Sequence, residues 1–171
     1  FGSWMGGDRD GNPNVTASTT NEVILLSRWQ AATLYEKEFT KLIQNLSLHE
    51  CSKKIKDKVG NTWEPYRVYL RPIRNKLQTT QREIESSLNN KSKPNSQLLV
   101  NSIDEILEPL NEVYKSLCSI KCEIIANGIV LDLIRLAHTF GLNLAKLDIR
   151  QESSRHTSLI NSVCKKLGLP K

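Results

Sequence analysis

The sequence predicts a mainly α-helical fold in which a long helical region lies between two short strands. Apolar residues recur every three or four positions over most of residues 18–141, which is the spacing of one helix face. Residues 144–149 form a short apolar run after a glycine turn, which predicts a buried strand at residues 146–149. Residues 2–5 have the character of a strand end, because a polar turn follows them. We therefore expect three parts: a strand and loop (1–17), a helical region (18–141), and a strand with a final helix (142–171).

The polar turn after the first strand is rich in glycine. Gly6, Gly7 and Gly11 can adopt positive φ or allow another group to approach closely, and Pro13 keeps the residue before it out of the helical region. Clusters of Gly, Asp, Asn and Pro are usually simple turns. The arginine between two carboxylates, Arg9, would also suit an ion network that positions the loop. Composition alone does not choose between these interpretations and a functional site.

Helix starts and stops are indicated by capping signals. A Ser or Thr followed three residues later by Glu can form a capping box, proline is tolerated in a first turn, and glycine commonly ends a helix. The starting signals are Thr19 with Thr16 as an alternative, Ser47, Pro65, Ser102, and Ser153 or Ser154; the stops are Gly60, Gly128, Gly141 and Gly168. The predicted helices span residues 19–45, 47–58, 65–88, 102–127, 130–139 and 153–167.

Two prolines fall inside these predicted helices. Pro72 lacks an amide hydrogen and clashes with the carbonyl one turn earlier, so we expect a kink there or a helix that starts again nearby. Pro109 is expected to bend its helix or delay its start. Residues 89–96 are polar and contain a proline, which predicts an exposed, mobile loop.

The charge and hydropathy patterns argue against two classes of partner. The net charge of +6 permits nucleic-acid binding, but the basic residues are interleaved with polar or acidic ones and no ladder of aromatic and basic residues accompanies them. A solvated helix face is therefore favoured, and no nucleic-acid partner is expected. No apolar run approaches the roughly 18–20 residues that cross a bilayer, so no membrane role is expected.

The four cysteines lie in helix-like sequence and not in a dense loop framework. This distribution is typical of reduced thiols, which indicates a cytoplasmic protein. Cys118 and Cys122 are spaced to share one helix face, but no further residue with zinc-site spacing accompanies them. No metal site is therefore expected within the chain.

Two blocks of sequence carry a specific resemblance. Residues 1–16 read Phe-Gly-Ser-Trp-Met-Gly-Gly-Asp-Arg-Asp-Gly-Asn-Pro-Asn-Val-Thr, and residues 147–156 read Leu-Asp-Ile-Arg-Gln-Glu-Ser-Ser-Arg-His. Both resemble signatures of the phosphoenolpyruvate carboxylase family. Residues 25–29, 64–67 and 124–128 are similar too, in the same order along the chain. The resemblance therefore extends over essentially the whole sequence.

The resemblance implies that the chain is part of something longer. Members of the family are several times longer, and this sequence begins at Phe1 without a methionine and stops at Lys171, so we expect an internal fragment. The implied fold is a fragment of a parallel β/α barrel. In such barrels functional groups lie where strands end, and both signature blocks fit that placement.

The resemblance also implies site residues. Arg150, the arginine of the second block, is expected to bind phosphoenolpyruvate, because its planar fork suits carboxylate and phosphate oxygens. The alternative is that Arg150 merely pairs with Asp148 or Glu152. Trp4 is expected to line an apolar pocket near the methylene group of the substrate, with barrel core as its alternative. Residues expected to support the site are Asp8, Arg9, Asp10, Asn12, Gln151 and Arg155.

The implied reaction is the carboxylation of phosphoenolpyruvate by bicarbonate to oxaloacetate and phosphate, a lyase activity that requires Mg²⁺ or Mn²⁺. The family's catalytic histidine motif, its glycine-arginine loop and its Glu and Asp metal ligands are absent from this sequence. We therefore expect the fragment alone to be inactive, with the rest of the same polypeptide as its partner and a homotetramer as the full enzyme. The alternative is a free-standing helical interaction module without catalysis.

Overall fold

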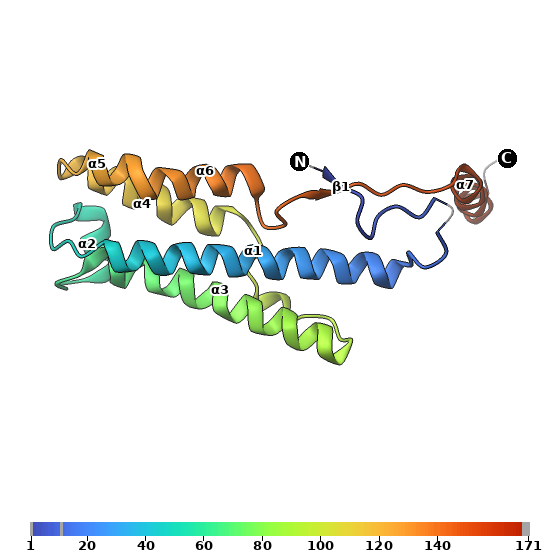
Figure 1. Cartoon of the computed structure of the whole chain (residues 1–171), viewed down its shortest axis with the longest axis horizontal. Coiled ribbons are helices and arrows are strands. Elements are labelled where there is room, and N and C mark those ends of the chain that lie inside the picture. The colour runs from blue at the N-terminus through green and yellow to red at the C-terminus, as the bar shows by residue number, and fades with distance from the viewer. Residues whose placement is uncertain (1, 11, 169–171) are drawn as a thin grey trace. The chain divides into compact units, whose positions relative to one another are not determined.

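The computed structural model describes residues 2–10 and 12–168, so Gly11 of the predicted turn lies outside the described residues. Helices dominate these residues, which confirms the mainly α-helical class. The elements in chain order are β1 (Gly2–Ser3), α1 (Ala17–Asn45), α2 (Lys53–Val59), α3 (Pro65–Asn90), η1 (Ser96–Leu98), α4 (Asp104–Ser119), α5 (Glu123–Ile125), η2 (Ala126–Val130), α6 (Leu131–Phe140), β2 (Lys146–Leu147) and α7 (Ser153–Leu167) (Figure 1).

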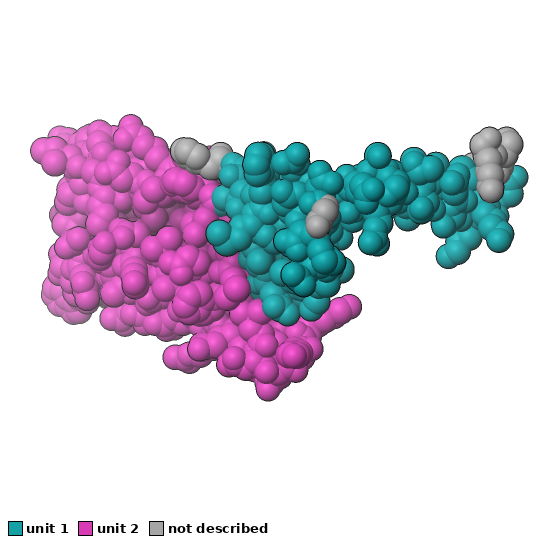
Figure 2. Space-filling model, turned by 45° about the vertical axis from the view of Figure 1, so that its right-hand side comes forward, with its two compact units in different colours: residues 1–25, 145–171 teal, residues 26–144 magenta. Residues whose placement is uncertain are grey.

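The chain divides into two compact units, coloured separately in Figure 2. Residues 1–25 and 145–171 form the strand unit, which contains both strands, α7 and the start of α1. Residues 26–144 form the helical unit, which contains the rest of α1 and the helices from α2 to α6.

The apolar core belongs to the helical unit, where α3 contacts α2 and α4, and α4 contacts α6. Each of these helices contributes a stripe of apolar side chains at helical spacing. The core side chains with no exposed surface include Phe39, Leu42, Tyr66, Leu70, Ile84, Ile106, Leu110, Val113 and Leu117. Burial of such residues stabilises the fold by roughly 1.5–3 kcal/mol for each large side chain.

The first helix has nearly the predicted extent, but Thr19, the cap expected first, does not cap it. α1 runs from Ala17 to Asn45. The hydroxyl of Thr16 accepts a hydrogen bond from the amide of Thr19 at 3.2 Å, so the alternative cap is the observed one. Glu22 does not complete a capping box, because its carboxylate accepts instead from the hydroxyl of Ser18.

The second helix starts later than predicted. α2 begins at Lys53 and not near Ser47, although it ends at Gly60 as expected. The Ser47 hydroxyl donates to the carboxylate of Glu64 at 3.3 Å and therefore caps no helix. Ser52 takes the N-cap position, and its carbonyl accepts the first hydrogen bonds of α2.

The third helix passes through its proline. α3 runs unbroken from Pro65 to Asn90, so the helix does not start again at Pro72. The lost hydrogen bond is tolerated because buried side chains on both sides of the proline, including Leu70 and Leu77, fix the helix in the core. Most residues of the loop at 89–96 are exposed, as predicted.

The fourth helix is shorter than predicted. α4 ends at Ser119 and not near residue 127, because Lys121 adopts a left-handed conformation with φ of 61° and turns the chain. Cys118 and Cys122 consequently lie on either side of this turn and do not share one helix face. Gly128 ends no helix, since it lies within η2 with φ of −89° and ψ of −116°.

Other boundaries of this region agree better with prediction. Glu105 accepts hydrogen bonds from the amides of Asn101 and Ser102, which is half of the predicted capping box, while the Ser102 hydroxyl accepts from Asp104. α6 ends at Gly141 as predicted.

The last helix has the predicted extent but a different N-cap residue. α7 ends at Gly168, as expected. Ser153 and Ser154 both lie inside the helix, and Glu152 occupies the N-cap position without a side-chain cap, so the predicted serine caps are wrong.

The two short strands lie side by side, although a long helical region separates them in sequence. β1 and β2 pair in parallel, with Gly2 opposite Lys146 and Ser3 opposite Leu147. Both strands are shorter than predicted, and β2 is not buried, because within the strand unit no described layer covers it. Ile149, which follows β2, is 62% exposed, and α7 contains no buried residue.

Candidate functional site

The ends of the two strands form the candidate site. The amide of Asp148 donates to the carbonyl of Ser3, and beyond the strands Arg150 exchanges main-chain hydrogen bonds with the opening loop. The amide of Arg150 donates to the carbonyl of Gly7, and the amide of Arg9 donates to the carbonyl of Arg150, both at 2.9 Å. The two signature blocks of the sequence therefore meet through their backbones.

The side chains of Trp4 and Arg150 meet at this point. The guanidinium carbon of Arg150 lies 4.9 Å from the centre of the Trp4 ring, within the range of a cation–π interaction. Among the described residues Arg150 forms no ion pair with Asp148 or Glu152, so the alternative of a simple local pair is wrong. Trp4 is 59% exposed and is not core within this chain.

A glycine turn directs Trp4 towards Arg150. The carbonyl of Trp4 accepts hydrogen bonds from the amides of Gly7 and Asp8, at 2.9 and 3.1 Å. Gly6 has φ of 75° in this turn, and a Cβ there would lie 2.6 Å from a methyl group of Val23. Both the backbone conformation and the space therefore require glycine at position 6.

The acidic and amide residues of the loop make local turns. Asp8 accepts a hydrogen bond from the amide of Asp10, and Asn12 accepts one from the amide of Asn14. Neither aspartate pairs with Arg9 in the part of the chain that the structure describes, so the suggested ion network of the loop is wrong. The loop is held by hydrogen bonds to backbone and hydroxyl groups.

The remaining candidates lie at the edge of this arrangement. Gln151 accepts a hydrogen bond from the neighbouring amide of Glu152. Arg155 lies exposed in the first turn of α7. The structure brings none of these side chains into contact with Trp4 or Arg150 through a described hydrogen bond or ion pair.

Sequence reasoning missed one residue of the site, Thr20. Its side chain is only 6% exposed, and its hydroxyl lies 2.7 Å from both the Gly6 carbonyl and an Nη atom of Arg9. Thr20 lies in the first turn of α1, where polar residues are usually exposed. No sequence pattern marks this threonine as buried.

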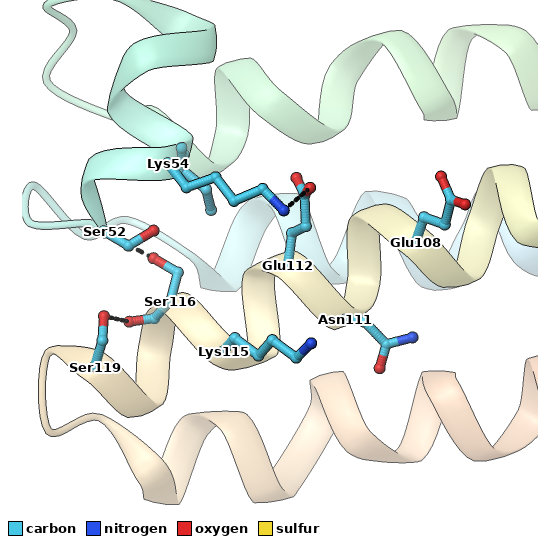
Figure 3. Close-up of a pocket in the computed structure, with 9 residues that line it drawn as sticks. Ser52, Lys54, Glu108, Asn111, Glu112, Lys115, Ser116 and Ser119 are labelled. Atoms are coloured by element: carbon cyan, nitrogen blue, oxygen red, sulfur yellow. Dashed lines mark hydrogen bonds and ion pairs between the residues drawn. The ribbon is translucent and has the colours of Figure 1, made fainter.

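The helical unit contains a separate cavity of about 780 Å³ between α2 and α4, to which mostly polar residues contribute (Figure 3). Glu112 lines this cavity and binds Lys54, Lys58 and Tyr69. Burial opposes ionisation of this carboxyl, but the hydrogen bonds from these three partners outweigh burial and lower its pKa to about 2. Ser116 also lines this cavity, and its hydroxyl accepts a hydrogen bond from the amide of Ser52 at 2.8 Å.

The described residues contain no group of three or more His, Cys, Asp or Glu side chains that could hold a metal ion. Cys51, Cys118, Cys122 and Cys164 are free thiols. Among the helices that the structure describes, none has both the length and the apolar character to cross a membrane.

Comparison with known proteins gives one family. Residues 1–171 match the family model described as phosphoenolpyruvate carboxylase. The chain is 46% identical over 169 residues to the phosphoenolpyruvate carboxylase of Hahella chejuensis, and 43% identical over 171 residues to that of Klebsiella pneumoniae. It is 42% identical over 167 residues to that of Tolumonas auensis. These matches cover 98–99% of this chain but only 19% of each relative, so the chain spans about a fifth of the length of the curated relatives that it matches.

Proposed function

The chain belongs to the phosphoenolpyruvate carboxylase family, and from this premise we propose that it is an internal segment of an enzyme that carboxylates phosphoenolpyruvate with bicarbonate. The products are oxaloacetate and inorganic phosphate, which makes the whole enzyme a carbon–carbon lyase. The proposal rests on one observation above all: the two signature blocks meet, with the Arg150 guanidinium over the Trp4 ring.

Arg150 is the residue that binds the substrate in this proposal. The ring of Trp4 holds one face of the guanidinium, so the N–H groups around its edge stay available. Within the described residues these N–H groups have no hydrogen-bond or ion-pair partner. A planar fork held in this way can bind two oxygens of a phosphate or carboxylate at once.

Trp4 forms an apolar wall of the same site. Its ring is more than half exposed in this chain, so it can contact a small substrate beside Arg150. In this proposal the Trp4 ring contacts the methylene group of phosphoenolpyruvate, which needs an apolar neighbour while the charged groups of the substrate bind Arg150. Asp8, Asp10 and Asn12 shape the loop that holds both residues.

The charge that develops during carboxylation needs fixed positive groups. An enolate formed from phosphoenolpyruvate carries negative charge, which a preorganised guanidinium stabilises without moving. The family resemblance implies Mg²⁺ or Mn²⁺ as well. Since no described cluster of side chains in this chain could hold such an ion, the proposal places its ligands elsewhere in the whole enzyme and assigns this segment no step at the metal.

The wider context follows from the same premise. β1 and β2 are parallel neighbours, which supports their assignment as two strands of a parallel β/α barrel whose other strands lie in the rest of the polypeptide. The whole enzyme is proposed to be a cytoplasmic homotetramer. The isolated segment is proposed to be inactive, because it lacks the catalytic histidine motif that the family carries elsewhere.

The test uses the whole polypeptide that contains this segment. Oxaloacetate formation is measured through malate dehydrogenase, with phosphoenolpyruvate and bicarbonate each omitted in turn. Arg150→Ala is expected to lower kcat/KM for phosphoenolpyruvate by about 100-fold, because a lost charged hydrogen-bonding group costs about 3 kcal/mol. Arg82→Ala is the matched control, since Arg82 is an exposed arginine on α3 of the helical unit.

Two outcomes would refute the proposal. Wild-type kinetics in Arg150→Ala would remove the assigned site. A whole polypeptide that produces no oxaloacetate, while the 171-residue segment binds a defined protein partner, would favour a helical interaction module instead.

A further inference from the structure

The hydroxyl of Thr20 holds the opening loop of the candidate site at two points. It lies 2.7 Å from the carbonyl oxygen of Gly6 and 2.7 Å from an Nη atom of Arg9. Gly6 belongs to the turn that directs Trp4, and the amide of Arg9 donates to the carbonyl of Arg150. A single oxygen atom therefore holds the opening loop at two points, the turn after Trp4 and the residue whose amide bonds to Arg150.

The donors and acceptors in this network are determined by chemistry. The guanidinium of Arg9 can only donate, so the Thr20 oxygen accepts that bond. A hydroxyl has one proton, and the carbonyl of Gly6 is its closest acceptor, with the carbonyl of Thr16 farther away at 3.1 Å. The Thr20 hydroxyl therefore donates its hydrogen bond to the carbonyl of Gly6, and its oxygen accepts a hydrogen bond from the guanidinium of Arg9.

The network is partly buried around a buried Thr20, so water would replace its hydrogen bonds incompletely. Thr20 is 6% exposed. The Nε atom of Arg9 is buried without a hydrogen-bond partner among the described residues. Within those residues, the bond to Thr20 is therefore the one hydrogen bond that the Arg9 guanidinium makes. Removal of the hydroxyl would leave a donor and an acceptor unpaired in a site that water reaches poorly.

We propose that Thr20 is a positioning residue for the anion site, acting through Gly6 on Trp4 and through Arg9 on Arg150. This inference rests on the proposed function, because the site is the one assigned there to phosphoenolpyruvate. Thr20 need not touch the substrate. Its role is to hold the guanidinium and the ring in register, since a small displacement of a binding group can cost a large part of its effect.

The experiment compares isosteric and conservative variants of the whole enzyme. Thr20→Val keeps the volume and the methyl group but loses the hydroxyl, and Thr20→Ser keeps the hydroxyl. We expect Thr20→Val to raise KM for phosphoenolpyruvate about tenfold with kcat changed less than about threefold, from the cost of unpaired buried groups. Thr20→Ser should stay within about twofold of the wild-type KM, because the network is retained.

A matched control separates positioning from stability. Thr80 on α3 is also a buried threonine: its hydroxyl donates to the Lys76 carbonyl and accepts from the amide of Val100. Thr80→Val should lower the thermal midpoint of the enzyme but leave KM unchanged. If Thr20→Val does the same, with KM within about twofold of wild type, the role of Thr20 is structural only and the inference is overturned.

A double-mutant cycle tests the path from Thr20 to Arg150. Arg150→Lys keeps the charge but loses the planar fork. In that background Thr20→Val should change KM less than about twofold, because the group that it positions is already lost. Fully multiplicative effects on KM would overturn the inference.

The same data separate this inference from the function on which it rests. A raised KM in Arg150→Lys beside a normal KM in Thr20→Val refutes the role of Thr20 and leaves the proposed function standing. A normal KM in Arg150→Lys refutes the assigned substrate site itself, and the inference with it.

Discussion

Gly7 and Asp148 are in direct backbone contact: a Cβ built on Gly7 would lie 2.2 Å from the carbonyl oxygen of Asp148. The carbonyl of Gly7 also accepts the amide hydrogen bond of Arg150. The opening loop and the end of β2 therefore approach as closely as two main chains can. Such an approach leaves room for a hydrogen atom at position 7 but not for a methyl group.

Gly7→Ala should therefore separate the two segments. The added methyl cannot be accommodated by a side-chain movement, because the atom that it meets is backbone. We expect a loss of about 5- to 150-fold in kcat/KM for phosphoenolpyruvate in the whole enzyme, since overpacking of this kind costs about 1–3 kcal/mol. Steady-state kinetics measure the effect, and an unimpaired Gly7→Ala enzyme would contradict the close contact.

Ser116→Ala should destabilise the helical unit. The Ser116 hydroxyl is buried, accepts from the amide of Ser52 at 2.8 Å and lies 2.7 Å from the hydroxyl of Tyr66. The variant would leave both partners unpaired, at a cost of about 1–3 kcal/mol. Ser119→Ala is the control, because among the described residues the Ser119 hydroxyl bonds only to a carbonyl of its own helix (Figure 3). Urea unfolding followed by circular dichroism should separate the two variants, and equal midpoints would count against the role of Ser116.

Glu112→Gln should reveal the acid sensitivity of the helical unit. Its pKa is about 2 in the folded chain against an ordinary value of 4.5, so the ionised carboxylate stabilises the fold above pH 4.5. That contribution is lost as the pH falls from 4.5 towards 2. At pH 7 the variant should be less stable by about 1 kcal/mol, since its lysine partners are partly exposed.

The control for this prediction lies on the same helix. Glu108 lines the same cavity but forms no ion pair among the described residues. Unfolding of wild type, Glu112→Gln and Glu108→Gln is compared between pH 2 and pH 7. A stability difference between wild type and Glu112→Gln that does not shrink on acidification would contradict the prediction.

Tyr35→Phe should show the opposite pH dependence. The Tyr35 hydroxyl donates to the carbonyl of Gly141 at 2.7 Å, and burial raises the pKa of Tyr35 to about 12 from 10.0. The variant should lose about 1 kcal/mol of stability below pH 10. Above pH 10 the unfolded tyrosine ionises first, so the advantage of the wild type falls as the pH rises towards 12. A constant difference up to pH 12 would be inconsistent with a raised pKa.

The sequence allowed the long helices to be predicted because their signals are local. The apolar spacing and the stops at Gly60, Gly141 and Gly168 depend only on neighbouring residues. The turn after Ser119 was missed because the apolar spacing continues through it and Lys121, not a glycine, takes the left-handed conformation. The start of α2 was missed because Ser47 bonds to Glu64, which is distant in sequence.

The site was predictable only in part, for the same reason. The family resemblance pointed to Trp4 and Arg150, and the structure places them in contact. The supporting role of Thr20 depends on how the opening loop folds back on α1, which no local pattern encodes. The exposure of β2 was missed because an apolar run predicts burial without specifying which part of a polypeptide provides it.

The confinement of the apolar core to the helical unit has a consequence for amide exchange with deuterated water. Backbone amides of α3 and α4 are protected by that core and should open only when the whole helical unit unfolds. The amides of β1 and β2 are protected only by the hydrogen bonds of a two-stranded sheet, whose residues do not belong to the described core. They should therefore exchange far sooner in the 171-residue chain. The rigidity that the proposed role of Arg150 requires would then come from neighbouring strands of the longer polypeptide.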